Sequence, residues 1–298
     1  DHTALAAIRA GAQVLRPEGE IRCKGDALHE VFETLLKKDY DAFCVFDADN
    51  FVDPAFLSRM NDAFCAGAKA AKGAMRVKNP EDGPLCACYG LYFTCFDFFF
   101  SRARMNCGLS SKLVGTGFAV HRSVLEKSHG WNSVTIAEDA EFAAYLAETG
   151  TRVWFVPEAV TYDEAPTSVL VSLRQRRRWS SGVMDVAQAQ LGSLACGVFD
   201  EGFGYAFDAD AAVLSGGKLF PWVRAGAGAA ERGADDCTFA AGARGRIFRD
   251  DDVCVFAQQN SGRAIQLARD FAVPAVYGLV ASVKSRVDPV PHQGLARN

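Results

Sequence analysis

Two aspartates, Asp47 and Asp49, stand one residue apart directly after an apolar run at residues 43–46. A short apolar run rich in β-branched and aromatic residues predicts a buried strand, so the two acids lie at its carboxyl end. In open α/β sheets ligands bind at that edge, and paired carboxylates are hard oxygen ligands suited to Mg²⁺ or Mn²⁺. Asp and Asn are also common turn residues, so an ordinary turn explains the pair equally well.

A second acidic group lies at residues 138–141, where Glu138 and Asp139 begin a segment of helical spacing that runs to Gly150. Acids in the first turn of a helix interact favourably with the helix dipole, so capping alone accounts for such a cluster. The group gains meaning only from the other motifs of the chain.

A long helical pattern at residues 167–191 carries Gln175, Arg178 and Trp179 within five residues. Arginine forms forked, permanently charged contacts with phosphates, and tryptophan offers a flat apolar surface. The alternative is a solvated basic helix face with Trp179 in the core.

Two further positions could contact a ligand. Lys24 precedes the helical pattern of residues 28–36, and a lysine beside a helix amino end is a candidate phosphate contact, although most such lysines are simply solvated. The turn Gly115-Thr116-Gly117 permits close backbone approach or positive φ, and the alternative is a plain hairpin or bulge.

The elements that must position these residues alternate between helix and strand. Helical spacing predicts helices at 3–10, 28–36 and 55–64, and apolar runs predict strands at 13–15, 43–46, 68–76 and 153–156, the last ended by Pro157. This alternation predicts an α/β fold with a mainly parallel sheet flanked by helices. We assign residues 1–192 to this domain and expect residues 193–298 to form an irregular tail, divergent or disordered.

Composition narrows the class of protein. The 298 residues are 49% hydrophobic and 23% charged, as in ordinary globular chains, and the net charge of -4 gives no basic footprint for nucleic acid. Ten cysteines without a C-x-x-C pair predict a reducing compartment rather than a zinc ribbon. The apolar run at residues 86–100 is shorter than the roughly 20 residues of a membrane span and predicts a buried or interfacial helix.

Taken together, the order and spacing of Asp47-x-Asp49, Gly115-Thr116-Gly117, Glu138-Asp139 and Gln175-x-x-Arg178-Trp179 resemble the family 2 glycosyltransferases. The likeness covers roughly residues 1 to 190. It is closest to the membrane-associated, inverting branch that includes cellulose, chitin and hyaluronan synthases. The resemblance implies a GT-A fold, a nucleotide-diphosphate sugar donor, a glycan or other hydroxyl acceptor, and a place at the cytoplasmic face of a membrane.

On the donor side, the resemblance implies that Asp49, with Asp47, holds Mg²⁺ or Mn²⁺. A divalent ion neutralises charge on the leaving nucleoside diphosphate. Lys24, Asp47, Gln175 and Arg178 then bind the donor and its diphosphate.

On the acceptor side, Asp139 matches the general base that takes the acceptor proton, and Glu138 is its neighbour in the motif. The resemblance implies that Gly115, Thr116, Gly117 and Trp179 contact the acceptor.

The sequence departs from the family in two places. The first strands of the fold, expected before residue 3, are absent, so the chain looks truncated at its amino end and its sheet is expected to expose an apolar edge. Beyond about residue 192 no stretch is apolar enough to replace the expected membrane helices.

Two alternatives remain at this stage. The chain could be an inactive, truncated remnant of such an enzyme. It could also be a haloacid-dehalogenase-type phosphatase with Asp47 as nucleophile, although this hypothesis leaves residues 175–179 without a role.

Overall fold

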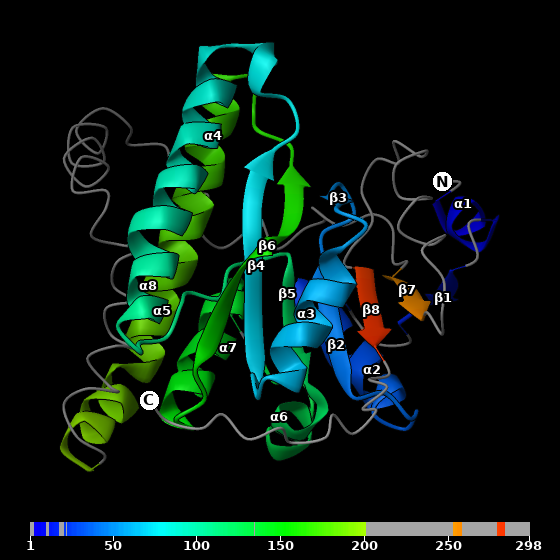
Figure 1. Ribbon diagram of the computed structural model, residues 1–298, viewed down its shortest axis with the longest axis vertical. Helices are drawn as coiled ribbons and strands as arrows, with labels where there is room; N and C mark the ends of the chain where they lie inside the picture. Colours follow the sequence, from blue (N-terminus) through cyan, green and yellow to red (C-terminus); the bar gives the residue numbers. More distant parts are fainter. Residues whose placement is uncertain are drawn as a thin grey trace, which may run out of the picture.

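The computed structural model describes residues 3–9, 12–17, 21, 23–133, 135–200, 253–257 and 279–283. These residues form one sheet with helices on both faces (Figure 1). The strands are β1 (Gln13–Leu15), β2 (Ala42–Phe46), β3 (Phe51–Val52), β4 (Ala70–Val77), β5 (Phe118–His121), β6 (Val153–Asp163), β7 (Val253–Ala257) and β8 (Leu279–Val283). Their order across the sheet is β1-β7-β8-β2-β5-β4-β6-β3.

The helices confirm the expected alternation. They are α1 (Thr3–Arg9), α2 (Lys24–Leu35), α3 (Phe56–Cys65), α4 (Pro84–Cys95), α5 (Ala103–Asn106), α6 (Arg122–Lys127), α7 (Glu138–Glu148) and α8 (Val169–Asp200), with a short 3₁₀ turn η1 (Pro80–Asp82). A π-helical segment, η2 (Phe96–Arg102), continues α4 into α5. The run at residues 86–100 is therefore a helix, as expected.

The sheet is mixed rather than mainly parallel, which corrects the expectation from the sequence. Strands β4 and β6 pair in parallel, as do β7 and β8, but β5 runs antiparallel to both β2 and β4. Alternation of helices and strands does not encode strand direction. A strand that enters from the same edge at which its neighbour ends gives the same pattern as a crossover.

Strand β6 continues through Pro157 to Asp163, whereas the sequence pattern placed its end at residue 156. The register between β4 and β6 shifts between Gly73 and Ala74, which marks a bulge. Proline is compatible with a bulge because the ladder hydrogen bond is interrupted there. The extension carries Asp163 to the same edge of the sheet as the aspartates that follow β2.

Strand β2 pairs with β5 on one edge and with β8 on the other, both antiparallel. The exposed apolar edge expected beside β2 is therefore not observed, because β8 supplies its hydrogen bonds. Most of the expected tail, residues 193–298, lies outside the described residues. Its described parts are the end of α8 and the strands β7 and β8.

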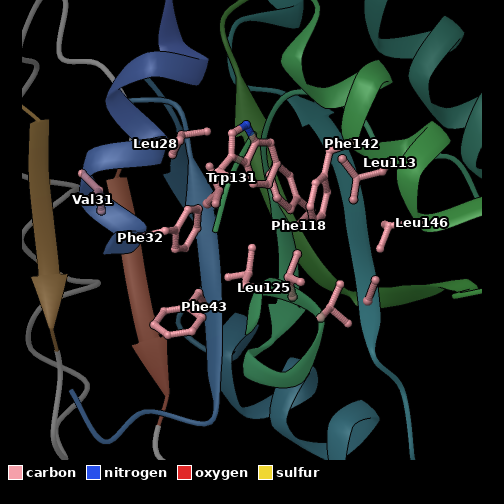
Figure 2. Packing of buried hydrophobic residues seen from close by; sticks show 14 of the residues in the cluster. Leu28, Val31, Phe32, Phe43, Leu113, Phe118, Leu125, Trp131, Phe142 and Leu146 are labelled. Atoms are coloured by element: carbon pink, nitrogen blue, oxygen red, sulfur yellow. The ribbon is translucent and has the colours of Figure 1, made fainter. Parts of the chain in front are cut away.

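Strand β2 is buried on both faces. Phe43 and Val45 point into a core shared with α2 and α7, and Cys44 and Phe46 point into a second core under α3. The first core is built on Trp131, whose ring stacks on Phe142 at 4.1 Å and also faces the rings of Phe32 and Phe118 (Figure 2). The β2 carboxyl end is thus anchored from both sides.

Helices α4 and α8 lie side by side at one end of the sheet, and α1 lies at the other end (Figure 1). The Tyr89 hydroxyl of α4 lies 2.8 Å from the Ser172 hydroxyl of α8. Among the described residues, no helix combines the length and apolar content needed to cross a bilayer.

Candidate active site

The two aspartates lie in the tight turn that follows β2. The Asn50 N–H donates to the Asp47 carbonyl at 3.1 Å, which closes the turn. The Asp47 N–H points inward and lies 2.9 Å from the Thr116 hydroxyl and 3.2 Å from Asn50 Oδ1. The turn is thus more than a connection, because its backbone is fixed by a side chain from the glycine turn.

Lys24, the first residue of α2, lies at the centre of the acidic groups, and its side chain is 16% exposed. Its ammonium group pairs with the Asp47 carboxylate, donates to the Gly115 carbonyl at 2.7 Å and lies 3.7 Å from Glu138 Oε1. Burial by itself lowers the pKa of Lys24, but Asp47 and Glu138 raise it above its ordinary value. Lys24 therefore remains charged and joins the two acidic motifs.

Asp139 reaches from the first turn of α7 to the glycine turn. Its Oδ2 accepts a hydrogen bond from the Gly115 N–H at 2.6 Å, and its Oδ1 accepts one from the Ala140 N–H at 2.8 Å. Helix capping does not explain the first bond, because Gly115 lies outside the helix. Each carboxylate oxygen keeps a lone pair for a further donor.

Glu138 is buried beside Asp139. Burial raises the pKa of Glu138 to about 7, Asp139 raises it further, and Lys24 opposes both effects. Gly25 lies under this residue, where an added Cβ would stand 3.4 Å from the Glu138 Cβ and 2.1 Å from the Ser133 hydroxyl. The start of α2 therefore packs directly against the start of α7.

The turn at residues 115–117 requires its second glycine. Gly117 has φ +63°, and an added Cβ would lie 2.8 Å from Thr161 Oγ1. Its N–H donates to the Val45 carbonyl at 2.8 Å, which ties the turn to the end of β2. The Thr116 side chain is buried and bonds to Asp47 N–H and Asn50, so its hydroxyl faces inward.

Gln175, Arg178 and Trp179 all lie on α8. Gln175 Oε1 accepts a hydrogen bond from the Tyr89 hydroxyl at 3.4 Å, whereas Arg178 is exposed and Trp179 is 41% exposed. The expectation of a solvated helix face fits Arg178, but Trp179 is not in the core. Within the described part of the chain, no hydrogen bond or ion pair joins these three side chains to Asp47 or Asp139.

Helix α8 nevertheless packs close to the acids of α7. A Cβ added to Gly182 would lie 2.7 Å from the Ala137 Cβ, so the two backbones approach closely one turn after Arg178. Val186 and Val183 pack with Ala140 in a small core between the helices. The motif of α8 is thus held beside the helix that carries Glu138 and Asp139.

Sequence reasoning missed Asp163 and Lys72. Asp163 ends β6 and bonds to Asn50, and burial together with Asp47 and Asp49 raises the pKa of Asp163 to about 7. Lys72 is buried in β4, where burial lowers its pKa to about 8 while Asp97 and Asp163 act in the opposite direction. No sequence signal marked Asp163, since the proline at 157 predicted that its strand had already ended.

The donor set at the β2 turn suits a divalent cation. Burial and the neighbouring Asp47 raise the pKa of Asp49, so negative charge is concentrated here. Among the described residues, no group of three or more metal-ligating side chains converges. Two carboxylates with phosphate oxygens and water are a usual set for Mg²⁺. Asp47 and Asp49 therefore fit an ion that is shared with a phosphate-bearing ligand.

A mixed sheet flanked by helices, with paired acids at the end of a central strand, is consistent with a GT-A glycosyltransferase domain. The sequence model of Glycosyl transferase family group 2 matches residues 42–227, and the chain belongs to this family. The match begins at β2 and includes every candidate site residue except Lys24.

Curated relatives carry the same family character. A probable glycosyltransferase of Bacillus subtilis (strain 168), YdaM, is 30% identical over 174 residues, which are 57% of this chain and 40% of that protein. Glucomannan 4-beta-mannosyltransferase 7 of Arabidopsis thaliana is 26% identical over 175 residues, 57% of this chain and 31% of that protein. A UDP-forming cellulose synthase of Dictyostelium discoideum, matched in its catalytic polypeptide, is 26% identical over 174 residues, 54% of this chain and 15% of that protein. The chain therefore spans well under half the length of these relatives.

Proposed function

We propose that this domain transfers a sugar from a nucleoside-diphosphate sugar to a hydroxyl acceptor with inversion at the anomeric carbon. The observation that carries the proposal is the double role of Gly115. Its N–H holds the Asp139 carboxylate at 2.6 Å, and its carbonyl accepts from Lys24, which pairs with Asp47. One residue thus links the candidate base to the candidate donor site.

In this mechanism Asp139 accepts the proton of the acceptor hydroxyl. The acceptor oxygen attacks the anomeric carbon from the face opposite the diphosphate. The bond between that carbon and the diphosphate oxygen breaks, and its electron pair leaves with the nucleoside diphosphate. The bonds from Gly115 and Ala140 hold the Asp139 carboxylate in one orientation for this step.

The donor side is supported by the charge arrangement of the β2 turn. Asp49 with Asp47 would hold Mg²⁺ or Mn²⁺, which supplies charge neutralisation for the departing diphosphate. Lys24 holds the Asp47 carboxylate in place. On α8, we assign Arg178 and Gln175 to the diphosphate, and Trp179 to a sugar ring of the acceptor.

On the acceptor side, we assign Gly115 and Gly117 to the turn against which the acceptor lies. The inward-facing hydroxyl of Thr116 removes that side chain from direct acceptor contact and gives it a structural role. Family membership argues against the phosphatase hypothesis, because that hypothesis gives Gln175 and Trp179 no function.

We also propose that the outer face of α4, η2 and α8 lies on a membrane surface, at its cytoplasmic side. This face carries large exposed apolar side chains on neighbouring helices: Leu91, Phe98, Phe99, Val169, Leu170, Val171 and Leu173. Exposed arginines, including Arg102 and Arg174, flank them. Apolar side chains bordered by arginine are typical of surfaces that bind anionic lipid headgroups.

The experiment that tests the transfer reaction is a donor screen. The 298-residue chain is mixed with UDP- and GDP-sugars and Mn²⁺ or Mg²⁺, and release of nucleoside diphosphate is followed with and without oligosaccharide acceptors. We expect metal-dependent release from at least one donor, and product NMR is expected to show the inverted anomer. Retention of the anomeric configuration would contradict the assignment of Asp139 as the base.

A further inference from the structure

Asp163 lies at the same sheet edge as the β2 turn, although 116 residues separate it from Asp47. Its carbonyl accepts from the Lys78 N–H at 2.8 Å, which fixes its backbone beside the end of β4. Its carboxylate accepts a hydrogen bond from Asn50 Nδ2, and Asn50 is only 5% exposed. The last residue of β6 is therefore bonded to the turn that carries the paired acids.

The Asn50 amide is oriented by this bond. A carboxylate accepts hydrogen bonds and does not donate, so Asp163 selects the NH₂ end of the amide. The carbonyl end of Asn50 must then face the opposite way, where it accepts from the Thr116 hydroxyl and lies 3.2 Å from the Asp47 N–H. If the amide turned over, two donors would face its NH₂ group and lose their acceptor.

Thr116 completes the connection between the two turns. It is 2% exposed, and its hydroxyl lies 2.9 Å from the Asp47 N–H. The next residue, Gly117, bonds to the Val45 carbonyl, so the whole glycine turn follows the position of Thr116. A change at Asp163 is therefore transmitted through two buried side chains to both turns.

The charge of Asp163 is compensated inside the fold. Lys72 is 4% exposed in β4 and interacts electrostatically with both Asp163 and Asp97. Asp97 in turn pairs with Arg76 at 2.7 Å. A buried carboxylate with a buried counter-charge keeps its charge and its role as a hydrogen-bond acceptor.

We propose that Asp163 is a positioning residue that, through Asn50 and Thr116, fixes the turn of Asp47 and Asp49 relative to the turn that holds Asp139. This inference rests on the proposed function for its catalytic meaning. It assigns Asp163 no contact with donor or metal.

Hydrogen exchange tests the connection without any turnover. In the 298-residue chain, amides of residues 44–50 and 113–118 are compared between the unchanged protein, Asp163→Ala and a control, Glu158→Gln, which alters an exposed acid of the same strand. We expect exchange to be about tenfold faster in both segments of Asp163→Ala and unchanged in the control, since each segment loses a buried hydrogen-bonded support. Faster exchange in only one segment, or in neither, overturns the proposal.

If Asp163→Ala fails to fold, Asp163→Asn replaces it. The amide keeps the shape of the side chain but can donate as well as accept, so it no longer selects one orientation of Asn50. Exchange in both segments is expected to rise about threefold. Unchanged exchange in this variant overturns the proposal.

A kinetic cycle separates this inference from the proposed function. In Asp163→Ala the donor KM is expected to rise about tenfold with kcat changed less than about threefold, and adding Thr116→Val is expected to produce little further change. Independent, multiplying effects would overturn the connection. If the unchanged protein transfers no sugar, the proposed function fails, and the exchange experiment alone decides the role of Asp163.

Discussion

The sheet edge and the outer helices of this domain handle polar groups in opposite ways. At the edge, Lys24, Asp47, Glu138 and Asp139 are bonded to one another or to Gly115. On the outer helices, Arg178 and Trp179 extend from α8 into solvent. The edge is organised without a ligand, whereas the α8 motif has its aromatic and cationic groups available.

This difference indicates how the two regions contribute to catalysis. Charged groups that are already oriented stabilise a transition state without reorganisation at the moment of reaction. We infer that the edge supplies fixed chemistry and that α8 supplies contacts made only when the donor binds. The variants below test this division, because those at the edge should affect chemistry and stability and those on the outer helices should affect neither.

The largest effect is expected for Asp139→Asn. The amide is a poor proton acceptor, so transfer to the acceptor should fall by about 10²- to 10⁴-fold, the usual contribution of a general base. Donor affinity, measured by calorimetry, should remain unchanged. Glu148→Gln at the other end of α7 is the control, and equal rates for the two variants would exclude Asp139 as the base.

Lys24→Met should be the most destabilising change at the edge. It leaves Asp47 and Glu138 without their shared cation, and removal of one partner of a buried ion pair lowers the free energy of unfolding by about 3 kcal/mol. Urea unfolding measures this value. Arg174→Met, on the exposed face of α8, should change it by less than about 0.5 kcal/mol. A similar loss in both variants would remove the contrast between the two regions.

Glu138→Gln should change how stability depends on pH in buffer with a chelator. The groups that face Glu138 are Lys24, Asp47, Asp139 and Cys23. The pKa of Glu138 is about 7 in the folded protein and about 4.3 in an unfolded chain, so the folded state binds this proton more tightly. Its contribution to stability is therefore complete below about pH 4 and is lost as the pH rises through about 7.

At about pH 8 the Gln variant should be more stable than the unchanged protein by up to about 3 kcal/mol, because each pKa unit corresponds to about 1.4 kcal/mol. At about pH 4 the two should differ little. Urea titrations at both values measure the difference. Parallel stability curves would show that Glu138 titrates normally.

The smallest effect on the fold is expected for the double change Phe98→Ser and Phe99→Ser. These side chains are 56% and 73% exposed, so the free energy of unfolding should change by less than about 0.5 kcal/mol. Binding to vesicles that contain phosphatidylglycerol should weaken about tenfold or more. Ile8→Ser, an exposed apolar position on α1, is the control, and equal binding of both variants would locate the membrane face elsewhere.

Much of the edge follows from the sequence because its signals are local. The run at residues 43–46 has the length and composition of a strand buried on both faces, and the acids that follow it must lie at its carboxyl end. The helix of Glu138 and Asp139 begins where the acids predict it, at Glu138. The α/β class and the family follow from these elements in order.

The remaining features depend on tertiary contacts that no local pattern encodes. The direction of β5 is fixed by its pairing with β2 and β4, and β6 passes Pro157 only because a bulge accommodates it. The place of Asp163 depends on that extension. Thr116 was expected at the acceptor, but burial of its hydroxyl against Asp47 gives it an internal partner.

The antiparallel course of β5 also separates the two ends of the central strands. Gly117 bonds to the Val45 carbonyl at the end of β2, whereas at the other end of β5 the Arg122 N–H bonds to the Asp41 carbonyl and the His121 N–H to the Lys69 carbonyl. The connections at residues 39–41 and 66–69 therefore lie on the side of the sheet away from the acids. Fluorescent labels or affinity tags inserted in these connections would report on the domain while leaving its chemistry intact.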